Sequence, residues 1–381
     1  MWGFRVPVTN LRATFWLAIV AAVALFAIAA PAAAAESPRV MASRVLTGNG
    51  GSLDWCKEKN LITFDRQVSP REVEVFTIRP NGDQETCVTC GNDSMPRGIR
   101  GRPVWHPSCD YMAIQVQGPF FKASAYENLS WGFHTDIWLV AADGSWAQKV
   151  ISSPLGGAVL EPRFSDDGLM VAWGDRHTTG KRIPQGRDPS QQTPAAENPW
   201  DGWALAVADV VPRPGARVGL ANRRILFDRR EGFVEPSAFV AGRIWHGRNQ
   251  SGLPIIDEVR NVDPNGHNSV QIWRSTGTWK DRPVPSPNGK VVAISSSEGF
   301  DWHFPPDLAD TLRTELWVHD ADGGQAMRIT HYNEGLRSGE RSLAIDYAWS
   351  PSGQEIAVYS VVAGIGRPKR EIRILTLDQP Y

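Results

Sequence analysis

One short phrase recurs along the chain and limits its possible folds more than any other feature. It consists of an anchor residue, a tight turn that usually contains Gly, and a small residue eight positions after the anchor. The clearest copies start at Trp105, Phe164, Pro285 and Trp349 and place Ala113, Ala172, Ala293 and Ala357 at the eighth position. Weaker copies start at Trp55 and Ala238, so neighbouring anchors lie 47 to 74 residues apart. A repeat of this length indicates a propeller or a solenoid.

Each copy of the phrase belongs to a unit of four predicted strands. The anchor ends strand A, and a turn such as Asp167-Gly168 leads into strand B, which holds the small residue. A loop of variable length precedes the alternating strand C, for example residues 136–140 or 315–318. A second turn, such as Asp143-Gly144, leads into strand D. Two hairpins with period-two alternation predict a four-stranded antiparallel blade.

The two ends of the chain predict how the array closes. Strand C of the last copy covers residues 371–377, so only residues 378–381 remain for a strand D. Residues 44–47 are of the same type as the strand D at residues 328–330, yet they precede the first anchor. We therefore expect an all-β, six-bladed β-propeller whose N-terminal strand completes the last blade and leaves only short edges.

The repeated residues resemble a known family of repeats. The order W-[SH]-P-x-G-x-x-x-A, then [DE]-[IL]-W, then R-[IL]-T is similar to the TolB-type, WD40-like propeller repeat, from about residue 44 to residue 381. The fourth copy departs from the pattern because it lacks an aromatic anchor. The stretch from Cys87 to Pro107 is similar to exported propellers of this group. The resemblance implies the fold and names no partner, because one fold serves many functions.

The first 35 residues have the features of a secretory signal peptide. Arg5 and Arg12 supply positive charge, residues 15–30 are apolar, and Ala33-Ala34-Ala35 offers a cleavage site. The apolar run is short for a membrane span. We expect a signal peptide over residues 1–35 and a single propeller domain over residues 36–381. The mature protein should then be periplasmic or secreted and not embedded in a membrane.

The predicted loops between strands B and C are longer than the Gly turns. They cover about residues 118–135, 174–202, 247–257 and 295–314. In a blade these loops emerge on the same face as the D–A connections, and the Gly turns emerge on the other face. Variable loops on a rigid scaffold commonly carry function. We therefore expect a functional site on the long-loop face.

Charged residues recur three positions before the anchors, at the mouth of the inner strand. The six positions in order are Ser52, Arg102, Glu161, Glu235, Arg282 and Asp346. Equivalent positions on adjacent inner strands face the central channel, so these side chains predict a charged rim that binds a polar ligand or an extended peptide. The alternative is a set of Arg–Glu pairs that satisfy one another across a wet channel.

Histidines gather in the predicted B–C loops and suggest a second kind of site. His134, His177 and His303 lie in these loops, and His246 lies near the start of one. Several imidazoles on one rim are suitable ligands for a divalent metal, as in similar propellers that act as pectic lyases. The alternative is that each His serves only its own loop, since no local spacing ties two of them together.

The four cysteines predict two disulfides. In an exported chain a C-x-x-C motif favours a disulfide over redox or zinc chemistry. Cys56 and Cys109 both lie near the Gly-turn face. We expect one bridge between Cys56 and Cys109 and a local bridge between Cys87 and Cys90.

The sequence excludes some functions and leaves two open. The net charge of −1, from 40 basic and 41 acidic residues, argues against a nucleic-acid partner. There is no Gly-x-Ser-x-Gly elbow, so no catalytic residue is assigned. The first hypothesis is a non-enzymatic, exported propeller, without a cofactor, that binds an envelope protein, a peptide or a small polar ligand on its long-loop face. The second is a metal-assisted lyase or hydrolase that acts on a carbohydrate in the channel.

Overall fold

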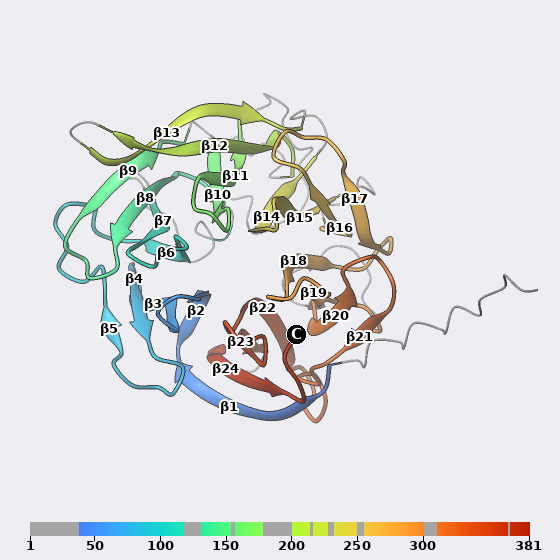
Figure 1. The fold of residues 1–381 in the computed structure, drawn as a ribbon. Coiled ribbons are helices and arrows are strands. Elements are labelled where there is room, and N and C mark those ends of the chain that lie inside the picture. Colours follow the sequence, from blue (N-terminus) through green and yellow to red (C-terminus); the bar gives the residue numbers. More distant parts are fainter. Residues whose placement is uncertain are drawn as a thin grey trace, which may run out of the picture. The chain divides into compact units, whose positions relative to one another are not determined.

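The computed structural model describes residues 38–117, 130, 132–153, 157–177, 200–213, 216–227, 232–249, 255–300, 311–364 and 366–381. These residues form a ring of six four-stranded sheets around a central axis (Figure 1). Within each sheet, neighbouring strands are antiparallel. The predicted six-bladed propeller is therefore confirmed. The predicted signal peptide lies outside the described residues.

The blades follow one another along the chain, and each runs from an inner to an outer strand. Blade one consists of β2 (Gly50–Cys56), β3 (Leu61–Ser69), β4 (Glu72–Ile78) and β5 (Thr86–Cys87). Blade two consists of β6 (Arg100–Trp105), β7 (Tyr111–Gln117), β8 (Thr135–Ala141) and β9 (Ala147–Ile151). Blade three consists of β10 (Ala158–Phe164), β11 (Met170–Arg176), β12 (Trp203–Arg213) and β13 (Ala216–Ile225).

The second half of the ring repeats this arrangement. Blade four consists of β14 (Val234–Val240), β15 (Arg243–Arg248), β16 (Glu258–Val262) and β17 (Val270–Arg274). Blade five consists of β18 (Lys280–Pro285), β19 (Val291–Ser296), β20 (Glu315–Asp320) and β21 (Ala326–Arg328). Blade six consists of β22 (Arg341–Trp349), β23 (Glu355–Ala363), β24 (Lys369–Leu377) and, as its outer strand, β1 (Val40–Gly48).

The N-terminal strand closes the ring, as the chain ends predicted. β1 pairs antiparallel with β24, and Val45 lies opposite Arg373. The first and last strands of the chain therefore belong to one sheet. This sheet is blade six, at the bottom of Figure 1. This pairing replaces the open edge that an incomplete blade would expose.

The aromatic anchors of the repeat pack against the preceding blade. Phe164 shares a core cluster with Ala113 of blade two, and Trp349 shares one with Ala293 of blade five. Trp55 shares a cluster with Ala357 of blade six, across the closure. The small residue at the eighth position therefore leaves room for the anchor of the next blade, which explains why the two recur together.

Blade four keeps an aromatic anchor, and the expectation that it lacks one is wrong. Ala238 shares a cluster with Val292 of blade five, whereas Phe239 shares one with Trp203 of blade three. The anchor is therefore Phe239. The reason is a shorter turn: Val240 pairs with Arg243 around Ala241 and Gly242, which have φ of 52° and 69°. A two-residue turn with both φ positive is the usual tight hairpin, and it changes the spacing that the repeat presupposes.

In two blades a glutamate near the start of strand C accepts a hydrogen bond from a threonine hydroxyl that follows strand D. In blade five the Thr330 hydroxyl donates to Glu315 Oε2 at 2.6 Å and accepts the Leu316 N–H at 2.8 Å. In blade one the Thr89 hydroxyl donates to Glu74 and accepts the Val75 N–H at 2.9 Å. The repeated [DE] and T of the sequence therefore tie the two outer strands together at the long-loop end of the blade.

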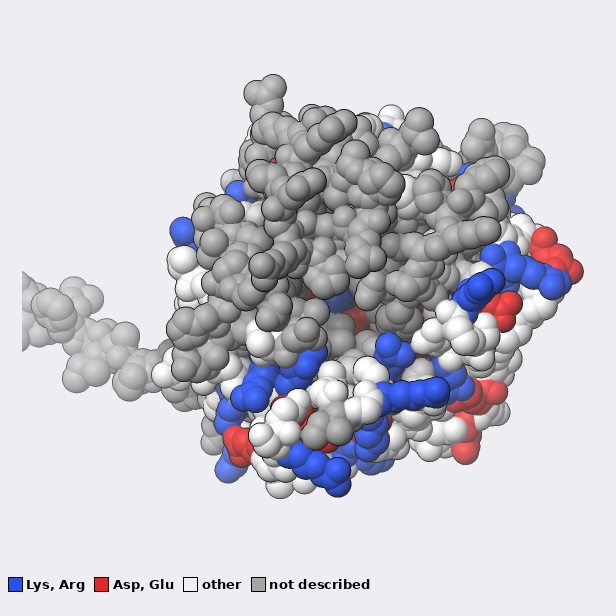
Figure 2. Space-filling view, turned by 180° about the vertical axis from the view of Figure 1, so that it is seen from behind, with Lys and Arg blue, Asp and Glu red and all other residues white. Residues whose placement is uncertain are grey.

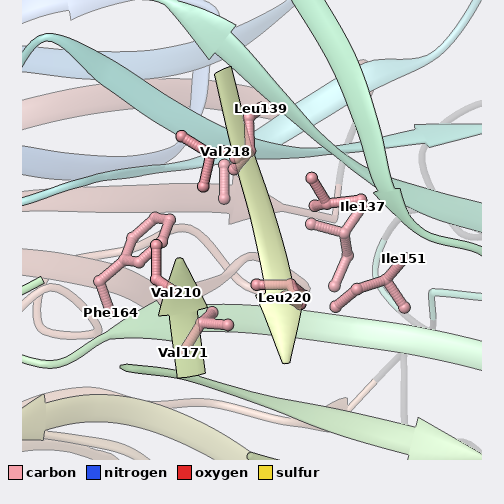
Figure 3. A pocket seen from close by; sticks show the side chains of 10 residues that line it. Ile137, Leu139, Ile151, Phe164, Val171, Val210, Val218 and Leu220 are labelled. Atoms are coloured by element: carbon pink, nitrogen blue, oxygen red, sulfur yellow. The ribbon is translucent and has the colours of Figure 1, made fainter. Parts of the chain in front are cut away.

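Packing between blades two and three leaves a small apolar void (Figure 3). It has a volume of about 10 Å³ and is lined by Ala113, Ile137, Leu139, Val150, Ile151, Phe164, Val171, Val210, Val218 and Leu220. A space of this size without polar groups does not hold a ligand. The void is a packing feature of the blade interface.

The two faces of the ring differ in their connections. The C-terminus lies on the turn face, where the Tyr381 N–H donates to the carbonyl of Gly353 in an A–B turn (Figure 1). The opposite face carries the B–C and D–A connections and is the one shown in Figure 2. Among the described residues no helix is long and apolar enough to cross a membrane.

Candidate functional site

The predicted rim residues lie on the inner strands, and the structure brings the charged ones together. Ser52 lies on β2, Arg102 on β6, Glu161 on β10, Glu235 on β14, Arg282 on β18 and Asp346 on β22. The five charged side chains belong to residues that are only 1% to 7% exposed. They therefore form a buried network around the axis rather than an open rim.

Bulges in the inner strands direct these side chains. The pairing of strands A and B shifts register between Gly101 and Val104 in blade two and between Leu160 and Arg163 in blade three. A corresponding shift occurs in each of the other four blades. Arg102, Glu161 and Arg282 have φ of 51°, 52° and 55° inside such bulges. A bulge with a left-handed residue re-aims its side chain away from the regular pleat.

Arg282 crosses the channel and joins the network. Its guanidinium lies 3.2 Å from Glu235 and 3.1 Å from Asp346, and it also contacts Glu161. These partners come from blades four, six and three, while Arg282 belongs to blade five. One side chain therefore ties together the inner strands of four blades.

Two further arginines complete the network from the opposite side. Arg102 contacts Glu161 and lies 3.8 Å from Glu235. Arg163, on the same strand as Glu161, donates to Glu161 Oε2 at 2.5 Å. Glu161 is thus contacted by three guanidinium groups in a site that excludes most water. Breaking a buried pair by removing one partner is costly because the other charge stays behind.

The sequence argument missed several members of this network. The Asp65, Asp54 and Asp281 carboxylates accept the N–H groups of Arg102, Trp105 and Arg282 at 2.8, 2.8 and 2.7 Å. They satisfy backbone donors that the bulges leave without a strand partner. The available signal was a charged residue directly after a strand segment that is mainly apolar, as with Asp65 after Phe64.

The buried carboxylates outnumber the arginines, and this affects their protonation. Burial raises the pKa of Glu235 to about 7, and the neighbouring Asp281 carboxylate acts in the same direction. Burial also raises the pKa of Asp281. Glu235 pairs with Gly247 as Asp281 pairs with Ser295, so the two acids occupy equivalent places in adjacent blades. The predicted alignment of Glu235 with Arg282 is therefore wrong by one position, because the anchor of blade four is Phe239 and not Ala238. The network therefore retains a proton close to neutral pH.

The four histidines predicted as metal ligands lie in different environments. His134 precedes β8, and its partial burial lowers its pKa. His177 follows β11, with Nε2 3.3 Å from Asp175 Oδ2. His246 lies inside β15 and is fully buried, and His303 lies outside the described residues. Among the described residues no three His, Cys, Asp or Glu side chains come together as a metal site.

His246 occupies a core position rather than a loop. It lies two residues beyond Ile244, the partner of the anchor Phe239. The equivalent residues of the other blades are Phe64, Ile114, Trp173, Ile294 and Val358. Both ring nitrogens lack a hydrogen-bond partner among the described residues, and burial lowers the pKa of His246 to about 3. The imidazole is therefore neutral and lies 5.4 Å from the Phe227 ring.

The cysteines form the two expected bridges. Cys56 pairs with Cys109, which joins blade one to blade two on the turn face, and Cys87 pairs with Cys90. Cys56 and Cys109 are each 1% exposed, whereas Cys90 is exposed. The first bridge therefore fixes two blades to each other, and the second stabilises the segment after the short strand β5.

Figure 2 shows a hollow at the centre of the long-loop face, with charged side chains at its floor. Lys and Arg gather below this hollow in the same view. Along the channel, the buried ion pairs of Arg282 join the inner strands of blades three, four, five and six.

No family model matches the chain, and no curated protein matches its sequence. Solved structures do resemble it. TolB from Acinetobacter baumannii is 14% identical with a TM-score of 0.49, over 84% of this chain and 65% of that chain. An oligogalacturonate lyase in complex with manganese is 10% identical with a TM-score of 0.49, over 90% and 96% of the two chains. A Mycobacterium tuberculosis puromycin-hydrolysing peptidase is 12% identical with a TM-score of 0.47, over 88% and 55%.

The chain therefore spans less than two thirds of the TolB and peptidase structures and nearly the whole lyase. At these identities the likeness concerns the fold alone. The function therefore has to be argued from the site.

Proposed function

We propose that this protein is a non-enzymatic binding propeller that takes a protein or a polar ligand on its long-loop face. The observation that carries the proposal is the buried network. Arg282 spans the channel between blades three, four and six, so the channel is closed below the long-loop face. A partner then meets a broad surface with a rigid floor instead of entering a tunnel.

In this proposal the buried network of charged residues on the inner strands forms the floor of the binding surface. Arg102 and Glu235 are 7% and 6% exposed, the largest values among its charged members. A ligand above the floor would reach these two first. Their orientation is fixed by ion pairs, and a preorganised polar group binds at a lower entropic cost than a mobile one.

The proposed location is the periplasm or the extracellular space. The two disulfides support it, because such bridges persist in oxidising compartments and are rare in the cytosol. The cross-blade bridge between Cys56 and Cys109 holds two blades together, so the fold itself gains from an oxidising environment.

Partner capture with mapping of the contact surface tests the proposal. The immobilised protein is incubated with an envelope fraction, and hydrogen exchange of the purified complex locates the protected segments. We expect protection in the long-loop segments 69–72 and 331–340 and none in the turns 57–60 and 142–145. Protection confined to these turns would overturn the proposal. Stoichiometric divalent metal together with turnover of a carbohydrate would favour an enzyme instead.

A further inference from the structure

The long-loop face carries exposed arginines that have no ion-pair partner among the described residues. Each lies in a different connection on this face: Arg71 between β3 and β4, Arg274 at the end of β17, Arg313 before β20, Arg337 between β21 and β22, and Arg367 between β23 and β24. Arg71 belongs to blade one, Arg274 to blade four, Arg313 to blade five and Arg367 to blade six, and Arg337 lies in the connection between blades five and six. Blue side chains, with some red ones among them, are visible in the described lower part of this face in Figure 2.

The opposite face is acidic for a reason that lies in the fold. Its turns carry more aspartates than basic residues. The aspartates are Asp83, Asp110, Asp143, Asp166, Asp167, Asp263 and Asp322, and the basic residues are Lys57, Lys59, Arg79 and Lys290. Several of these aspartates accept a backbone N–H two residues later: Asp143 from Ser145 at 2.9 Å, Asp167 from Leu169 at 3.0 Å. This is ordinary turn chemistry. The acidity of the turn face thus follows from the repeat.

Turn chemistry does not account for the arginines of the long-loop face. Arg71, Arg274, Arg313, Arg337 and Arg367 form no side-chain hydrogen bond or ion pair within the described residues, and they are not part of the repeated phrase. The long-loop face also carries acids, but several of these have basic partners: Asp93 pairs with Arg97, Glu298 with Lys280 and Glu334 with Arg328. In the described part of this face the five arginines therefore remain as unpaired positive charge. An exposed guanidinium without a partner is well suited to bind a carboxylate through two parallel hydrogen bonds.

We propose that the long-loop face binds a carboxylate-rich segment of a partner protein through these arginines. The inference rests on the proposed function and names the chemistry of the partner. The placement of the arginines favours a polypeptide over a regular polyanion, because they occupy different positions in five different connections. A flexible acidic chain can match irregular cationic sites, whereas a polymer with a fixed repeat cannot match them all.

A membrane surface fits the distribution of apolar residues less well. Six large apolar side chains are exposed among the described residues. Met41 and Val45 lie on the outer strand β1, Leu169 and Val270 lie toward the turn face, and only Val68 and Ile225 lie toward the long-loop face, at the ends of β3 and β13. Stable attachment to a bilayer needs apolar groups beside the basic ones. Val68 and Ile225 belong to blades one and three, which are not adjacent, so they do not form an apolar patch.

Charge reversal on the two faces tests the inference with matched variants. The first variant combines Arg71→Glu, Arg337→Glu and Arg367→Glu on the long-loop face. The control combines Lys57→Glu, Arg79→Glu and Lys290→Glu on the turn face, which changes the net charge equally. Binding of poly-L-glutamate is measured on the intact protein at low salt. We expect the first variant to lose roughly tenfold or more in affinity and the control to change less than about twofold.

Three results would overturn the inference: equal losses in the two variants, tighter binding of alginate than of poly-L-glutamate, or binding only to phosphatidylglycerol vesicles. Unfolding curves of both variants exclude loss of fold as the cause. Partner capture with the first variant also distinguishes a failure of this inference from a failure of the proposed function. If a captured partner protects segments 69–72 and 331–340 but binds the first variant unchanged, the face is the binding surface and its partner is not acidic.

Discussion

His246 shows how a single residue departs from the repeat at a cost to stability. Its position is apolar in the other five blades, and its ring nitrogens are buried without partners among the described residues. Burying a polar group without a hydrogen bond costs about 1–3 kcal/mol. We expect His246→Ile to raise the free energy of unfolding at neutral pH by a similar amount, measured by urea denaturation.

The pH dependence of this variant gives a second check. Because the pKa of His246 is about 3 in the folded protein and 6.5 ordinarily, the unfolded chain binds more protons between these values. Stability contributed by this residue therefore rises with pH from 3 to 6.5 and is constant above. In His246→Ile, the part of the rise in unfolding free energy with pH that comes from this residue should be absent. The reciprocal change Ile294→His in blade five should introduce such a slope and lower stability.

Glu235 should act in the opposite direction over an overlapping range. Its pKa is about 7 in the folded protein against an ordinary value of 4.5, so the folded state holds a proton that the unfolded chain releases. Stability from this residue is complete below pH 4.5 and falls as the pH rises to 7. Glu235→Gln keeps the shape of the protonated acid, so the difference in unfolding free energy between the variant and the natural protein should grow from pH 4.5 to 7. A constant difference would refute the assignment.

At the scale of strands and turns, the sequence predicted what depends on period and small residues. The six blades, the outer position of β1 and the two disulfides followed from alternation, Gly turns and cysteine spacing. The anchor of blade four did not, because the offset of eight positions assumes one turn length. The pair Ala241-Gly242 shortens that turn, and only the pairing of Val240 with Arg243 reveals it. Local spacing cannot detect a change of turn length when neighbouring apolar residues offer two anchors.

The two disulfides should differ in their contribution to stability. Cys56–Cys109 closes a loop with a sequence separation of 53, whereas Cys87–Cys90 has a separation of 3. On the loop-entropy model these bridges contribute about 4 and about 2 kcal/mol. Replacing Cys56 and Cys109 by Ser should therefore lower the melting temperature more than replacing Cys87 and Cys90.

The bridge that contributes less to stability should also be reduced first, because Cys90 is exposed whereas Cys56 and Cys109 are buried. Mild reductant should open Cys87–Cys90 first, and thiol labelling followed by peptide mass spectrometry locates the opened bridge. Labelling of Cys56 before Cys90 would contradict this expectation.

On the scale of the whole ring, the sequence predicted charged side chains on the inner strands near the axis. It did not show which of them form ion pairs with one another. The repeat aligned Arg102, Glu161, Arg282 and Asp346 on inner strands, which was correct. It could not show that bulges turn these side chains toward each other, since a bulge depends on the pairing of two strands. Nor could it show that Arg282 reaches three other blades. Contacts across the axis join residues far apart in the chain, such as Arg282 and Glu161 at a separation of 121 positions, and no local pattern encodes them.

The channel network should therefore stabilise the ring as a unit. Arg282→Met removes the cation that Glu161, Glu235 and Asp346 share, so that Arg102 and Arg163 remain as the cations beside Glu161 in a site that excludes most water. We expect a loss of about 3–5 kcal/mol in the free energy of unfolding, which is typical of a buried charge that loses its partner. Arg313→Met, an exposed arginine near the same blade, should change stability by less than about 0.5 kcal/mol.

A second substitution separates the charge effect from the loss of packing. If uncompensated carboxylates cause the loss, adding Glu161→Gln to Arg282→Met should restore part of the stability, although Glu161→Gln alone is expected to destabilise. Additive losses would mean that Arg282 acts through the volume of its side chain. Because the carboxylate partners of Arg282 lie on blades three, four and six, loss of these ion pairs should also weaken the coupling between the blades. The unfolding transition of Arg282→Met should therefore be broader than that of the natural protein, and an equally sharp transition would mean that the ion pairs do not couple the blades.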